Sequence, residues 1–142
     1  MRLRMGGGRL GAIDPAAIAK AEAALKSLSG NFTQWLNDEI AKLETARAAI
    51  RDAGQTAETM ESLYLRAHDL KDLGATYGFP LITRIAGLLC RHIDDKAKRL
   101  DVPMGLIDAH IDAIKTAARD DIKTDDQPAG QVMLQALEAR AA

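Results

Sequence analysis

Apolar residues recur at the three- and four-residue spacing of helices along most of the chain, and capping residues divide this pattern into segments. Asp14 followed by Pro15 predicts the start of a first helix, which ends at Ser29-Gly30. Asn31 begins a second helix, and Gly54 ends it. No segment shows the strict apolar–polar alternation of a strand, so the pattern predicts an all-α protein.

Four more helices are predicted after Gly54. Thr56 starts the third, and the pair Gly78 and Pro80 ends it. The fourth runs from Pro80 to about Arg99, a fifth follows the turn at 101–103, and a short last helix follows the break at 124–128. The predicted inward residues are Met60, Leu63, Ala67, Leu70, Gly74 and Tyr77 of the third helix, Leu81, Ile82, Ile85, Leu88, Leu89 and Ile93 of the fourth, Met104, Ile107, Ile111, Ile114 and Ala118 of the fifth, and Val132, Met133 and Leu137 of the last.

Six amphipathic helices with short connections predict an antiparallel four-helix bundle with additional short N- and C-terminal helices. The second to fifth helices are the longest and most regular, and we expect them to form the core. Residues 1–13 are expected to form a flexible arm, and residues 14–142 a single helical domain.

Composition supports this interpretation and narrows the function. Alanine accounts for 26 of the 142 residues and aromatic residues for only 4%, which favours helices over a sandwich or barrel. The formal net charge is −1, which argues against nucleic acid or an anionic membrane as a partner. No apolar stretch approaches the roughly 20 residues of a membrane span. The single cysteine favours a reducing, cytoplasmic setting.

One of the three histidines is predicted to face solvent. On a helical wheel His68 falls about 130° from the centre of the third helix's inner stripe. Leu65 is expected to be exposed beside it, and Gly74 to lie inward where a neighbouring helix passes close. The residues expected to surround His68 are Tyr64, Lys71, Asp72 and Ala75.

This arrangement points to phosphoryl chemistry. An exposed imidazole is a nucleophile near neutral pH because a substantial fraction of it is unprotonated. Lys71, one turn on, is placed to neutralise phosphoryl oxygens gathered on His68. Leu65 offers a partner an apolar contact, and the small Ala75 leaves room for its approach.

The segment His68-Asp69-Leu70-Lys71, with Gly78 ten residues after the histidine and Leu81 three beyond, resembles the signature of the histidine-containing phosphotransfer (HPt) domain family. The resemblance is close from Met60 to Ile93. It implies a four-helix bundle whose exposed histidine accepts a phosphoryl group from the aspartyl phosphate of one response-regulator receiver domain and passes it to another.

Carried over to this chain, the resemblance makes His68 the phosphorylated residue and Lys71 the charge-balancing one. Leu70 and Leu81 would pack beneath, with Gly74 and Gly78 as structural positions of the motif, and Tyr64, Leu65, Asp72 and Ala75 would contact the partner. The implied partners are receiver domains and a hybrid histidine kinase. The protein would be a monomer without a cofactor of its own, and the receiver would bring Mg²⁺. Since Gly6-Gly7-Gly8 lacks the rest of a phosphate-binding loop, no autokinase activity is expected.

Asp72 departs from the family pattern, which usually has glycine there. A carboxylate one turn from His68 would repel an incoming phosphoryl group, so a non-catalytic HPt-like adaptor that binds a kinase or receiver is the alternative. A metal-dependent helical enzyme using His68 and Asp72 is a third hypothesis. It is disfavoured because no second histidine-containing pair at ligand spacing completes a metal site.

The other reactive residues fit structural roles better. His92 and His110 fall on or near apolar stripes and are expected in the core or at its rim. Cys90 is expected to project outward as a surface thiol. An electropositive flank on the fourth helix is expected from Arg84, Arg91 and Arg99.

Overall fold

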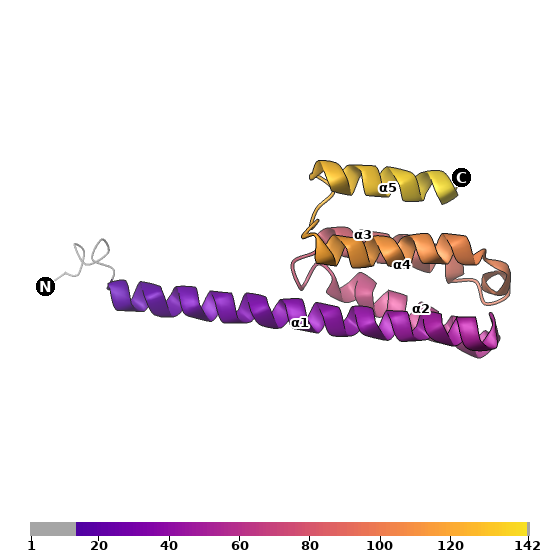
Figure 1. Cartoon of the computed structure of the whole chain (residues 1–142), viewed down its shortest axis with the longest axis horizontal. Coiled ribbons are helices and arrows are strands. Elements are labelled where there is room, and N and C mark those ends of the chain that lie inside the picture. Colours follow the sequence, from indigo (N-terminus) through magenta and orange to yellow (C-terminus); the bar gives the residue numbers. More distant parts are fainter. Residues whose placement is uncertain (1–13, 142) are drawn as a thin grey trace, which may run out of the picture. The chain divides into compact units, whose positions relative to one another are not determined.

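The computed structural model describes residues 14–141, so the predicted arm at 1–13 lies outside the described residues. Helices are the only regular elements in this part of the chain, which confirms the all-α prediction (Figure 1). The elements are α1 (Pro15–Ala53), α2 (Ala57–Leu73), α3 (Pro80–Ile93), the short 3₁₀ helix η2 (Lys98–Asp101), α4 (Met104–Arg119) and α5 (Pro128–Ala141).

The first two predicted helices are one continuous helix, α1, and the predicted break at Ser29-Gly30 is wrong. The start is as expected, because the Asp14 carboxylate accepts a hydrogen bond from the Ala16 amide at 3.0 Å. Gly30 costs a helix only about 1 kcal/mol relative to alanine, and good helix formers flank it on both sides. A glycine without a following proline was too weak a signal to end a helix.

The chain divides into two units, at Thr33 and Gln34, which are described separately. In the described part of the first unit, residues 14–33, nearly every side chain is exposed. Its large exposed apolar residues are Ile18, Leu25 and Leu28.

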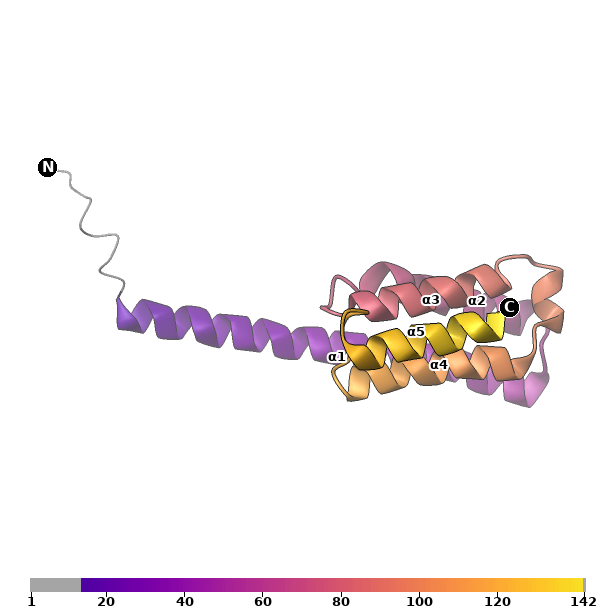
Figure 2. The ribbon, with the colours of Figure 1, turned by 90° about the horizontal axis from the view of Figure 1, so that it is seen from above.

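In the second unit, residues 34–141, the helices pack along their lengths around one core (Figure 2). Among the helices after α1, the most extensive contact joins α2 and α3, followed by that between α3 and α4, and α5 packs on α4. The largest fully buried side chains are Leu36, Leu43, Met60, Leu63, Leu70, Leu81, Ile82, Ile85, Leu89, Ile93, Ile107 and Ile111. Most of the predicted inward positions are therefore buried.

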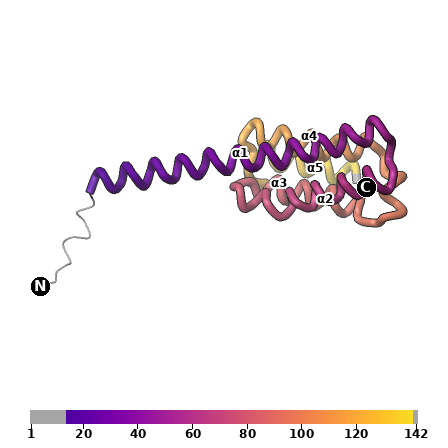
Figure 3. Tube along the Cα trace, turned by 90° about the horizontal axis from the view of Figure 1, so that it is seen from below, coloured from indigo at the N-terminus to yellow at the C-terminus, as the bar shows by residue number. Residues whose placement is uncertain are grey.

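A buried arginine links the second half of α1 to α4, which lies beside it (Figure 3). Arg47 is only 4% exposed, and its guanidinium donates to Asp108 at 3.1 Å and to Asp112 at 3.0 Å. It also donates to Glu44 through two nitrogens. These bonds and that of Lys115 lower the pKa of Glu44 to about 2, against the cost of desolvation. These polar contacts join α1 to α4 in addition to the apolar core.

One helix boundary after α2 differs from the prediction. The fourth predicted helix, α3, ends at Ile93 rather than near Arg99. The Asp95 carboxylate there accepts hydrogen bonds from the amides of Ala97 and Lys98, at 3.0 and 2.9 Å, and holds the chain in a turn.

The last helix was predicted at the right place but with its apolar face slightly rotated. Val132 is 66% exposed, whereas Leu134 and Leu137 are buried. With no strong amphipathic stripe in a short helix, small errors of register move a residue from the inner to the outer face.

Candidate functional site

The helix that carries His68 is fixed firmly at both ends. Thr56 is the N-cap, and its hydroxyl and that of Thr59 cap each other's backbone amides. Regular α2 ends at Leu73, and a run of turns continues to Gly78, whose φ of +93° suits glycine. The helix therefore ends five residues before the predicted Gly78, which closes the turns instead.

His68 lies on the outer face of α2 with 42% of its side chain exposed, as the wheel predicted. Leu65 beside it is 54% exposed, and Ala75 is also exposed. Leu70 and Leu81 are buried beneath this face. A half-exposed ring on a helix with a packed inner face is held in place yet open to a second molecule.

Two neighbours on α2 bracket the imidazole of His68. The ring of Tyr64 lies one turn before it, with 6.0 Å between ring centroids and 46° between ring planes. The Asp72 carboxylate lies one turn after it, with 3.4 Å between Asp72 Oδ2 and His68 Nδ1. The two ring nitrogens of His68 therefore have different surroundings.

The guanidinium of Arg99 lies over the ring of Tyr64, 5.6 Å from the ring centroid. Arg99 was predicted to be part of an exposed basic flank, but it is buried on η2 and 3.6 Å from a carboxylate oxygen of Glu61. No sequence pattern indicated this contact, because it depends on the turn after α3, which brings Arg99 back toward α2. Tyr64, His68 and Asp72 thus follow one another along α2, and Arg99 of η2 contacts the first of them.

A close contact between α2 and α3 lies at the end of the His68 helix. A Cβ placed on Gly74 would be 2.7 Å from both the backbone nitrogen and the Oγ1 of Thr83. The Thr83 hydroxyl accepts a hydrogen bond from the Ala75 amide at 2.7 Å. Gly74 is therefore required by a passing helix, as its inward position in the sequence predicted.

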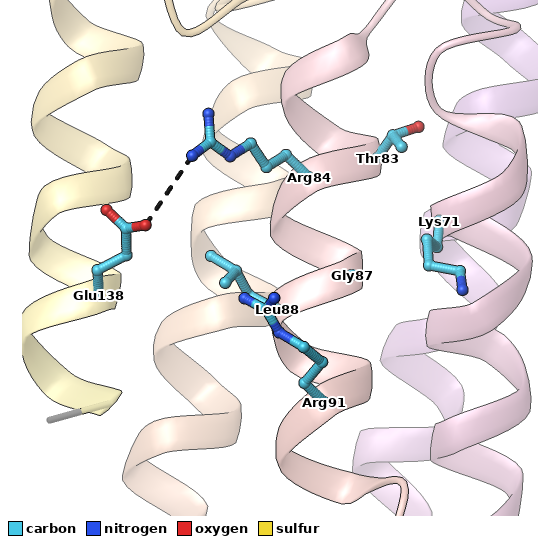
Figure 4. Close-up of a pocket in the computed structure, with 7 residues that line it drawn as sticks. All are labelled: Lys71, Thr83, Arg84, Gly87, Leu88, Arg91 and Glu138. Carbon is cyan, nitrogen blue, oxygen red and sulfur yellow. Dashed lines mark ion pairs between the residues drawn. The ribbon is translucent and has the colours of Figure 1, made fainter.

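Lys71 leans toward α3. A Cβ on Gly87 would lie 3.7 Å from Lys71 Cγ and Cδ, so the lysine stem passes over this glycine. Lys71 lines an open hollow of about 550 Å³ together with Arg84 and Arg91 of α3 and Glu138 of α5 (Figure 4). The sequence missed the contribution of α5, because only the fold brings it next to α3.

The charge of this hollow is mainly positive. Arg84 is paired with Asp125 and lies 3.9 Å from Glu138. Among residues 14–141, Lys71 and Arg91 make no ion pair, so their charges remain available at the surface. The predicted flank is thus present at Arg84 and Arg91, with Lys71 as its third member in place of Arg99.

Cys90 is buried rather than outward-facing, which contradicts the wheel. Burial raises the pKa of its thiol to about 11, so the reactive thiolate is scarce at neutral pH. The helical wheel misplaced Cys90 because most faces of α3 are buried against other parts of the chain. A cysteine nucleophile is a poor fit to this position.

His92 and His110 meet across α3 and α4, with 5.2 Å between ring centroids in an edge-to-face arrangement. His110 is fully buried, as its place near an apolar stripe suggested, and its Nδ1 lies 2.8 Å from the carbonyl oxygen of Leu106. Burial lowers the pKa of His110. His110 lies in the core and the half-buried His92 at its rim, and the pair is separate from His68.

Within residues 14–141, no group of three or more histidine, cysteine, aspartate or glutamate side chains is arranged to hold a metal ion. Nor does any helix in this range have the length and apolar character to cross a membrane. A scan against protein-family models, a search of curated proteins and a search of solved structures each found no match to this chain.

Proposed function

We propose that this chain is a histidine phosphotransfer protein, in which His68 accepts a phosphoryl group from one receiver domain and passes it to another in a multistep phosphorelay. The observation that carries the proposal is the half-exposed imidazole on α2, with Lys71 one turn further along the same helix. The proposed architecture is the antiparallel four-helix bundle of the HPt family, with α5 as an addition.

The proposed transfer uses His68 as a nucleophile. A ring nitrogen attacks the phosphorus of an aspartyl phosphate in line, the bond from phosphorus to the aspartyl oxygen breaks, and the aspartate leaves as a carboxylate. Phosphoryl transfer depends chiefly on positioning and on stabilisation of charge, and the receiver domain supplies Mg²⁺ and most of that stabilisation. This chain contributes the nucleophile and positive charge nearby, with no cofactor and no autokinase activity of its own.

The surface around His68 suits a transient partner. Leu65 offers exposed apolar area, and Ala75 leaves space at the end of the helix. Such an interface would be at the small end of the size range for protein complexes. The proposed partners are receiver domains and a hybrid histidine kinase in the cytoplasm, and the chain itself is proposed to act as a monomer.

The basic hollow supports the same proposal. Lys71 and Arg91 lack an ion pair within the described chain, and they lie on the α2–α3 face rather than deep in the core. Unpaired surface cations attract an acidic partner surface and speed its association. We assign this role in docking to Lys71 and Arg91. Lys71, three residues after His68, would also offset phosphoryl charge.

The test is transfer of radioactive phosphate from phosphorylated receiver domains. We expect label on the wild-type chain, none on His68→Gln, and normal labelling of His92→Gln, the matched control in which another partly exposed histidine is changed. Equal labelling of His68→Gln and wild type would refute the proposal. So would the absence of label on the wild type with every receiver domain of the source genome.

Asp72 favours a second candidate, a non-catalytic adaptor of the same fold. Its carboxylate lies 3.4 Å from the imidazole, where negative charge opposes an incoming phosphoryl group. If this repulsion prevents transfer, Asp72→Gly will gain labelling that the wild type lacks. If wild type and Asp72→Gly both stay unlabelled while receiver binding persists, the adaptor function is supported instead.

A further inference from the structure

The two nitrogens of the His68 imidazole are not equivalent, because a carboxylate lies beside Nδ1. The Asp72 carboxylate oxygen is 3.4 Å from Nδ1. Both side chains are on α2, one turn apart, so the helix itself holds them on the same face. On the opposite side of the ring, Tyr64 restricts the space into which the imidazole can turn.

We propose that Asp72 is a positioning residue that keeps a proton on His68 Nδ1 and thereby presents Nε2, with its lone pair, as the nucleophile. In a neutral imidazole one nitrogen bears the proton, and the group facing the other nitrogen decides which. A carboxylate accepts hydrogen bonds and repels a lone pair, so it favours Nδ1–H over a bare Nδ1. Asp72, which departs from the HPt pattern, thus positions the nucleophile as well as repelling the incoming phosphoryl group.

The proton on Nδ1 also matters after the attack. When Nε2 forms its bond to phosphorus and the aspartyl oxygen leaves, the imidazole becomes positively charged and its Nδ1 proton stays in place. The Asp72 carboxylate lies 3.4 Å from Nδ1, and its negative charge stabilises the charged ring. When the phosphoryl group moves on to the next receiver, the bond from Nε2 to phosphorus breaks and the neutral ring with Nδ1–H is restored.

Arg99 and Tyr64 support this geometry. Arg99 is 4% exposed and lies over Tyr64, and Tyr64 lies beside the imidazole. A buried guanidinium holds the aromatic ring more firmly than solvent would, and the ring in turn limits rotation of His68. Among the described residues, the Asp72 carboxylate forms the one ion pair with the imidazole.

The first experiment reads the proton directly and does not depend on phosphotransfer. Long-range ¹H–¹⁵N NMR spectra of the labelled full chain distinguish Nδ1–H from Nε2–H for each histidine at a pH where the ring is neutral. We expect mostly Nδ1–H at His68 in the wild type. Because both side chains are partly exposed, we expect a roughly two- to five-fold shift of the tautomer ratio toward Nε2–H in Asp72→Gly. Asp72→Asn, which keeps an oxygen acceptor without the charge, should fall between the two.

The second experiment rests on the proposed function and uses phosphoramidate, a small phosphoryl donor, in place of a receiver domain. Nuclear magnetic resonance then identifies which nitrogen of His68 is phosphorylated. We expect Nε2 alone in the wild type and a measurable fraction of Nδ1 product in Asp72→Gly. A wild-type His68 in the Nε2–H form, a tautomer ratio unchanged in Asp72→Gly, or a wild-type product at Nδ1 would each overturn the assignment of Asp72.

The two experiments separate the failure of this inference from the failure of the proposed function. If His68 takes the Nδ1–H form and Asp72→Gly changes it, but neither phosphoramidate nor any receiver labels His68, Asp72 is confirmed as a positioning residue and phosphotransfer is refuted. If label reaches His68 but the tautomer ratio is the same in the wild type, Asp72→Gly and Asp72→Asn, phosphotransfer stands and the role proposed for Asp72 is wrong.

Discussion

The contact between α2 and α3 at Gly74 should tolerate no side chain. A Cβ there would lie 2.7 Å from the Thr83 backbone nitrogen, and a backbone atom cannot turn away as a side chain can. Forcing such a contact typically costs about 1–3 kcal/mol. Gly74 has helical dihedral angles, so alanine also gains back about 0.5–1 kcal/mol of conformational entropy. The net expectation for Gly74→Ala is a loss of up to about 2.5 kcal/mol in the free energy of unfolding.

Gly105 provides a matched control for this substitution. It lies in the first turn of α4, and a Cβ there would meet no atom within 4 Å. Gly105→Ala should therefore stabilise the protein by up to about 1 kcal/mol. Urea unfolding followed by circular dichroism measures both variants against the wild type. A Gly74→Ala protein as stable as Gly105→Ala would show that the close approach of α2 and α3 is wrong.

Three further predictions concern other parts of the molecule. Arg47→Ala should lower the free energy of unfolding by about 2–4 kcal/mol in urea titrations, since it removes a buried, multiply bonded guanidinium, while Arg47→Met, which keeps the packing, should cost less. The pKa of His110 is lowered in the fold, so the unfolded chain binds more protons: stability should fall as the pH drops below about 6.5 and level off below the folded-state pKa. Between pH 5 and 7.5, the free energy of unfolding should change less steeply with pH in His110→Gln than in the wild type. If the proposed function holds, Lys71→Ala should slow receiver-dependent labelling about tenfold in quench-flow assays while leaving the free energy of unfolding within about 0.5 kcal/mol.

Local signals in the sequence predicted helix ends well where a side chain or a glycine acts on its own neighbours. Pro15 and Thr56 begin or cap helices as expected, and Gly54 has a φ of +86° after the last turn of α1. The predicted helix break at Gly30 was wrong, because a single glycine does not by itself end a helix. One glycine costs about 1 kcal/mol, which a long run of helix-forming residues outweighs.

Apart from the close approach at Gly74, contacts between distant segments escaped prediction. The helical wheel placed His68 outward correctly because α2 is covered on one side only, but it misplaced Cys90 because several elements cover α3. Arg99 was assigned to a solvated face, and its contact with Tyr64 depends on a turn that no periodicity reveals. The candidate site was therefore predictable where it lies on a single helix and not where a second segment completes it.

The direct test of the central claim is to map the phosphorylated residue after incubation with a phosphorylated receiver domain. The wild-type chain should carry one acid-labile phosphoryl group, and tandem mass spectrometry should locate it on His68. A phosphoryl group on any other residue, or one that persists in His68→Gln, would contradict the account.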